Sequence, residues 1–149
     1  MKKILFVCLG NICRSPMAEF VMKRLVSEAG MAEEFEIASA ATSTEELGNP
    51  VYPPSRRKLA EHGIDCKGKT ARQITKADYD YYDLIIGMDS SNLRNMHRFF
   101  GGDPEKVPKT ALSVGVGTVC DSKQVLLIIS GHNKARALRH CVEGGVDHA

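Results

Sequence analysis

The sequence predicts an α/β fold, a three-layer sandwich in which helices cover both faces of a parallel sheet of four or five strands. Short apolar segments that suit buried strands alternate along the chain with longer segments that suit helices. The 149 residues, 43% of them hydrophobic, are enough for one core of ordinary size. We therefore expect a single domain over residues 1–149.

The expected elements follow one another with recognisable boundaries. The chain predicts, in order, a strand over 3–8, a helix over 16–29, a strand over 34–39, a loop over 41–53, a helix over 54–63, a strand over 83–87 and a helix over 90–100. The apolar run from Ile4 to Val7 supports the first strand. Gly30 can end the first helix, and Pro53-Pro54 can start the second.

The segment between the first strand and the first helix has the pattern of an anion-binding loop. Cys8 and Arg14 enclose five residues, which are Leu9, Gly10, Asn11, Ile12 and Cys13. In such a turn the backbone N–H groups point inward and the helix start adds partial positive charge, so we expect residues 9–14 to bind phosphate. Arg14 would add a planar charged fork, and the same field favours Cys8 as a sulfur nucleophile. Open α/β sheets also bind ligands at this carboxyl edge.

The residues from Cys8 to Ser15, here called the phosphate loop, resemble the corresponding loop of the low-molecular-weight protein tyrosine phosphatases. The resemblance covers about residues 1–108 and continues through four motifs, at 14–19, 58–64, 71–73 and 83–89. It implies that Cys8, Arg14 and Ser15 are catalytic: Cys8 attacks phosphorus, Arg14 binds the phosphate, and Ser15 donates a hydrogen bond to the Cys8 sulfur. It implies no metal and no other cofactor.

The resemblance also implies that outer hydrogen bonds brace the phosphate loop through Asn11, Ser39 and His62. Asn11 would take a left-handed backbone conformation, which asparagine tolerates better than most residues. Local caps or solvent contacts explain Ser39 and His62 equally well. Cys13 either protects Cys8 by forming a disulfide under oxidation or is only a small buried side chain.

Several segments depart from the family pattern, among them Ala40-Ala41, where the family has Ala-Gly. The Asp-Pro pair that carries the family's general acid is missing, because Asp103-Pro104 comes too early and Asp121 is the sole carboxylate between residues 109 and 142. The general acid is therefore unassigned. Residues 44–47 lack the aromatic side chain that the family commonly places there, so Leu47 and Tyr52 are the nearest apolar candidates. Residues 67–70 contain no histidine, whereas relatives often carry one.

Residues from about 109 to 149 resemble instead a segment of glucosamine-6-phosphate deaminase, over 110–119, 124–138 and 142–146. Val125 to Ile129 suits a buried strand and Lys134 to Glu143 a helix, so the segment would complete the sheet of the phosphatase-like part. The two resemblances together predict a chimera. Lys134 corresponds to a phosphate-contacting lysine of the deaminase, although a solvated lysine explains it as well.

The predicted function is hydrolysis of phosphotyrosine or aryl phosphate monoesters through a cysteinyl-phosphate, impaired by the missing acid. Two alternatives stay open: a scaffold that binds phosphate without turnover, and an arsenate reductase that uses Cys66 and Cys120 as relay thiols. The net charge of +2 gives no basis for a nucleic acid or membrane partner, and no apolar run reaches the roughly 18 residues of a membrane span. Five irregularly spaced cysteines predict a reducing, cytoplasmic location.

Overall fold

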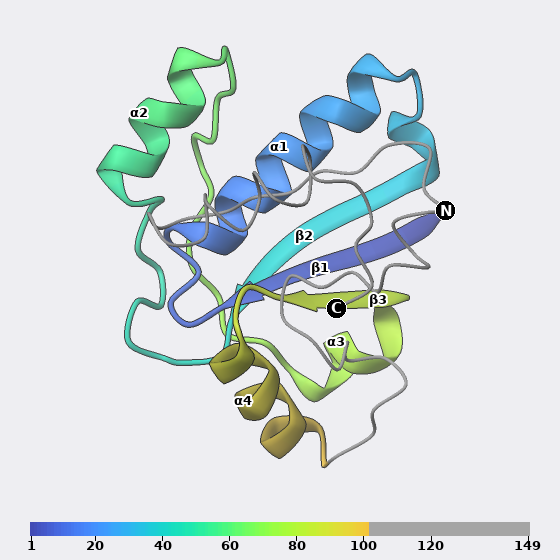
Figure 1. Cartoon of the computed structure of the whole chain (residues 1–149), viewed down its shortest axis with the longest axis vertical. Coiled ribbons are helices and arrows are strands. Elements are labelled where there is room, and N and C mark those ends of the chain that lie inside the picture. Colours follow the sequence, from blue (N-terminus) through green and yellow to red (C-terminus); the bar gives the residue numbers. More distant parts are fainter. Residues whose placement is uncertain (102–149) are drawn as a thin grey trace, which may run out of the picture.

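A parallel sheet forms the centre of the structure, which is a computed structural model that describes residues 1–101 (Figure 1). Its strands are β1 (Lys2–Cys8), β2 (Phe35–Ala41) and β3 (Leu84–Gly87), in the order β2-β1-β3. The parallel α/β sheet is confirmed, with three strands in the described residues. The further strand predicted at 125–129 and the helix after it lie outside them.

The strand register places the phosphate loop at one edge of the sheet. β1 pairs with β2 from Lys2↔Phe35 to Cys8↔Ala41, and with β3 from Ile4↔Leu84 to Val7↔Gly87. The carboxyl ends of all three strands therefore lie together. This is the edge at which the turn from Cys8 into the first helix begins.

Helices cover both faces of the sheet, as the sequence predicted. Figure 1 shows α1 (Arg14–Glu28) and α2 (Pro53–Glu61) on one side, and α3 (Lys76–Tyr81) and α4 (Ser90–Phe100) on the other. Side chains of β1 alternate between two buried clusters, because successive residues of a strand point to opposite faces. Ile4, Phe6 and Cys8 pack with α1, whereas Leu5 and Val7 pack with α4.

Two short helices were not predicted. One is the 3₁₀ turn Ala32–Glu34, and the other is α3, which is only six residues long. α3 begins with a capping box in which Thr75 and Asp78 each accept a hydrogen bond from the other's backbone N–H. Six residues are too few for a helical hydrophobic period, so this cap was the available signal. Within residues 1–101, no helix combines the length and apolar character that crossing a membrane requires.

Candidate functional site

The phosphate loop is held in shape by backbone hydrogen bonds from segments distant in sequence. Thr42 N–H donates to the Cys8 carbonyl at 2.9 Å, and Ser43 N–H donates to the Leu9 carbonyl at 3.0 Å. Tyr52 N–H donates to the Ile12 carbonyl at 2.7 Å. These bonds use three carbonyl groups of the loop and none of its N–H groups, which are the groups that bind the ligand in an anion site.

Two polar groups contact the Cys8 sulfur, which is 97% buried at the end of β1. The Asn11 backbone N–H donates to Sγ at 3.3 Å, and Ser15 Oγ lies 2.9 Å from it. Ser15 Oγ accepts a hydrogen bond from the Asn11 side-chain amide at 2.9 Å. Its own proton is therefore available to the sulfur, since the competing Ala40 carbonyl lies farther away, at 3.5 Å.

Asn11 connects the phosphate loop to two other parts of the fold. Its backbone is left-handed, with φ of 55°, as its residue type predicted. Besides Ser15, its Nδ2 donates to Ser39 Oγ at 2.8 Å, and its Oδ1 accepts from the Arg72 backbone N–H at 3.2 Å. All polar atoms of this buried side chain are thus used, which fixes the turn.

A buried charged group lies behind Asn11 and Ser39. Ser39 Oγ donates to Glu19 Oε2 at 2.5 Å, and the Lys69 ammonium lies 3.1 Å from the same oxygen and 3.1 Å from the Ser39 carbonyl. Lys23 donates to the other Glu19 oxygen at 2.6 Å. Glu19 was not predicted as a site residue, although it follows Ser15 by four positions and so shares its helix face. We refer to Glu19, Ser39 and Lys69 as the buried brace.

The charges of the buried brace respond differently to burial. Burial acts to raise the pKa of Glu19, but the hydrogen bond from Lys23, the charge of Lys69 and the hydroxyl of Ser39 outweigh it, so this pKa lies below its usual value. Burial lowers the pKa of Lys69, and the charge of Glu19 offsets only part of this effect. Glu19 is therefore held firmly as a carboxylate, whereas Lys69 depends on its partner.

The brace predicted at His62 requires correction. His62 is exposed at the end of α2, and its side chain makes no hydrogen bond to the phosphate loop within the described residues. Leu59 of α2 packs against α1, whereas His62, the residue that follows α2, is exposed to solvent. Of the predicted braces, Asn11 and Ser39 lie at the loop, and Lys69 supplies the cationic contact behind them.

Arg14 begins α1 and is anchored by a residue of another helix. Its Nη1 donates to Asp89 Oδ2 at 2.5 Å, and Asp89 caps α4 by accepting from the Asn92 N–H. Burial acts to raise the pKa of Asp89, but the hydrogen bond from Arg14, the backbone hydrogen bond from Asn92 and the charge of Arg14 together outweigh it, so this pKa lies below its usual value. In the described part of the chain Nε and Nη2 of Arg14 have no protein partner, so one side of the guanidinium is available for an anion.

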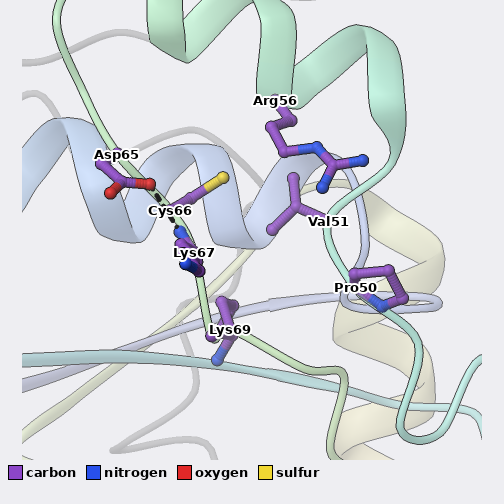
Figure 2. A pocket seen from close by; sticks show the side chains of 8 residues that line it. Pro50, Val51, Arg56, Asp65, Cys66, Lys67 and Lys69 are labelled. Atoms are coloured by element: carbon purple, nitrogen blue, oxygen red, sulfur yellow. Dashed lines mark hydrogen bonds between the residues drawn. The ribbon is translucent and has the colours of Figure 1, made fainter.

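The cysteines of the described residues, Cys8, Cys13 and Cys66, are all free thiols. Cys13 is a free thiol whose Sγ lies 3.1 Å from Ser55 Oγ on α2. Cys66 is buried, and burial raises the pKa of its thiol. It lines a cavity of about 340 Å³, together with Pro50, Val51, Arg56, Asp65, Lys67, Gly68 and Lys69 (Figure 2). A buried thiol with a raised pKa is poorly suited to relay a disulfide.

Several predicted residues lie outside the described range. These are Asp103-Pro104, Cys120, Asp121 and Lys134. The candidate general acid Asp121 and the whole deaminase-like segment therefore lie outside the described residues. Within residues 1–101, no three His, Cys, Asp or Glu side chains are grouped so that they could hold a metal ion.

Comparison with known proteins agrees with the geometry of the loop. The family described as "Low molecular weight phosphotyrosine protein phosphatase" matches residues 3–112. The mouse protein of that name is 50% identical over 97 residues, which is 65% of this chain and 61% of the mouse protein. This chain thus spans about 61% of the length of the curated relatives it matches.

Solved structures agree as well. The crystal structure of YfkJ from Bacillus subtilis has a TM-score of 0.73 at 32% identity, with 91% of this chain and 82% of that chain covered. A low-molecular-weight protein tyrosine phosphatase from Streptococcus pyogenes has a TM-score of 0.65 at 46% identity, with 72% and 70% covered. The matched residues include the whole phosphate loop and the buried brace. The chain therefore belongs to the low-molecular-weight phosphotyrosine protein phosphatase family.

Proposed function

We propose that this chain hydrolyses phosphotyrosine or other aryl phosphate monoesters through a cysteinyl-phosphate. The observation that supports it most directly is the position of the Cys8 sulfur, within 3.3 Å of the Asn11 N–H and 2.9 Å of Ser15 Oγ, in a turn that ends at Arg14. A sulfur at the base of an anion-binding turn is aligned to attack phosphorus. The names of the similar proteins also support phosphotyrosine as the substrate class.

The proposed reaction has two displacement steps. First the Cys8 thiolate forms a bond to phosphorus while the bond from phosphorus to the phenolate oxygen breaks. Water then attacks phosphorus, the sulfur–phosphorus bond breaks, and inorganic phosphate leaves. Arg14 binds two non-bridging oxygens through Nε and Nη2, and the Ser15 hydroxyl stabilises the sulfur when it leaves as a thiolate. A sulfur nucleophile needs a reducing compartment, which supports a cytoplasmic location.

Substitution of the nucleophile tests the proposal. Cys8→Ser should lower hydrolysis of p-nitrophenyl phosphate by roughly 10³- to 10⁶-fold, because the alcohol is a much weaker nucleophile. Cys66→Ser is the matched control. None of the residues that line the cavity at Cys66 belongs to the phosphate loop, so this variant should retain most of the activity. Background hydrolysis by the wild type, with phosphate still raising its melting temperature, would favour the phosphate-binding scaffold instead.

The missing Asp-Pro pair predicts a strong dependence on the leaving group. A general acid contributes about 10²- to 10⁴-fold, and it matters most when the departing oxygen is strongly basic. Without one, p-nitrophenyl phosphate should be hydrolysed far faster than phenyl phosphate. The slope is measured from kcat/KM for a series of substituted phenyl phosphates, because kcat/KM reports the first displacement, in which the phenolate leaves. Equal kcat/KM across the series would show that an acid is in place. A loss of about 10²- to 10⁴-fold in kcat/KM for phenyl phosphate in Asp121→Asn would identify that acid as Asp121.

A further inference from the structure

An open groove of about 460 Å³ extends from the phosphate loop to α4. The residues that line it are Leu9, Thr42, Ser43, Asn95, Arg98 and Phe99. Leu9 belongs to the phosphate loop and is 45% exposed. The groove therefore adjoins the phosphate loop at Leu9 and offers both apolar and polar contacts.

The two walls of the groove are fixed to the phosphate loop. Ser43 donates to the Leu9 carbonyl twice, from its N–H at 3.0 Å and from its Oγ at 2.9 Å. Helix α4, which forms the other wall, begins beside Arg14 because its cap is Asp89. A substrate held at Arg14 consequently has a defined position relative to the α4 wall.

The charge of the groove is carried by Arg98. This side chain is exposed, and no carboxylate within residues 1–101 forms an ion pair with it. Two acidic side chains lie near the loop: Asp89 is paired with Arg14, and Glu46 packs against Gly10, where an added Cβ would lie 3.1 Å from Glu46 Cγ. An acidic group on a substrate is thus attracted along the groove toward Arg98 and repelled from the Gly10 side.

We propose that the groove binds the peptide segment next to the phosphotyrosine and that Arg98 selects an acidic residue in it. Arg98 follows Asp89 by nine residues, which is about 13 Å along a helix. An extended peptide covers this distance in about three or four residues. The selected aspartate or glutamate therefore lies about three or four positions from the phosphotyrosine. This assignment rests on the proposed phosphatase function.

Two sets of phosphotyrosine peptides test whether Arg98 selects an acidic residue. One set carries a single glutamate three or four positions before or after the phosphotyrosine, and the other set carries glutamine at the same position. The wild type should show a kcat/KM about two- to fivefold higher for one glutamate peptide, as expected for an exposed ion pair. Arg98→Gln should abolish the difference and leave hydrolysis of p-nitrophenyl phosphate unchanged. Arg98→Glu should reverse the preference, so that the peptide with lysine at this position has a higher kcat/KM than the peptide with glutamate.

Arg94→Gln is the matched control, because Arg94 lies one turn earlier on α4, outside the groove lining, and donates to Ser91. It should retain the preference. Equal kcat/KM for all peptides, or a preference that persists in Arg98→Gln, would overturn the assignment. Peptide binding to Cys8→Ser, measured by fluorescence anisotropy, separates the two proposals: failure of hydrolysis in the wild type rejects the phosphatase, whereas loss of the glutamate preference in binding rejects the groove.

Discussion

Replacement of Asn11 by alanine is expected to lower the free energy of unfolding by about 3 kcal/mol. The side chain is 99% buried, so water cannot replace the hydrogen bonds it makes to Ser15, Ser39 and the Arg72 N–H. Alanine also disfavours the φ of 55° at this position. Urea unfolding followed by circular dichroism measures the change.

Asn11→Gly separates the two causes. Glycine adopts a positive φ without strain but makes none of the side-chain hydrogen bonds. We expect the glycine variant to be more stable than the alanine variant by about 1 kcal/mol and still less stable than the wild type. An alanine variant within about 0.5 kcal/mol of the wild type would contradict the prediction, since surface substitutions have effects of that size.

Replacement of Glu19 by glutamine is expected to cost about 3 kcal/mol, because it leaves the Lys69 ammonium, only 13% exposed, without its carboxylate partner. Glu28→Gln is the matched control on the same helix. Glu28 pairs with Arg24, but both side chains are about half exposed, so the loss should stay below about 0.5 kcal/mol. Adding Lys69→Met to Glu19→Gln should restore part of the stability, because no unpaired charge then stays buried. Urea unfolding of the four proteins decides the matter.

The stabilisation from Glu19 should also depend on pH. Its pKa is lower in the folded state than in the unfolded chain, so the carboxylate stabilises the fold at neutral pH. This contribution declines as the pH falls below the ordinary glutamate range and is gone below the folded-state pKa. Unfolding free energies between pH 7 and about pH 3 should therefore fall less steeply in Glu19→Gln than in the wild type. The lowered pKa values of Asp78 and Asp89 keep some slope in both proteins. Parallel profiles would contradict this account.

Most of the described fold could be predicted because its elements have local signals. The apolar run Ile4 to Val7 marks a strand buried on both faces, and the proline pair at 53–54 marks a helix start. The expected helix over 16–29 starts at Arg14 instead, which places the arginine in the first turn. α3 was not predicted, because a helix this short shows its N-terminal cap in the sequence but no hydrophobic period.

The site residues likewise fall into those that a local sequence signal predicts and those that it does not. Cys8, Asn11 and Arg14 are neighbours in sequence, so their spacing alone predicts a common loop. The partners that hold them are not: Ser39 and Lys69 meet Glu19 from separate segments, and Asp89 reaches Arg14 from 75 positions away. Such contacts follow from strand order and helix packing, which a single sequence does not specify. For the same reason the sequence predicted His62 near the phosphate loop, whereas in the structure His62 is exposed at the end of α2.

The bond between Arg14 and Asp89 changes the thermodynamics of the proposed phosphate binding. A free arginine side chain has about 2 kcal/mol of rotamer entropy, which it loses when it grips a ligand. Because Asp89 already holds Nη1, much of that freedom is lost when the chain folds. Binding then starts from a preorganised guanidinium and carries a smaller entropic penalty. A carboxylate that repels phosphate by its charge can thus still strengthen phosphate binding, by immobilising the arginine beforehand.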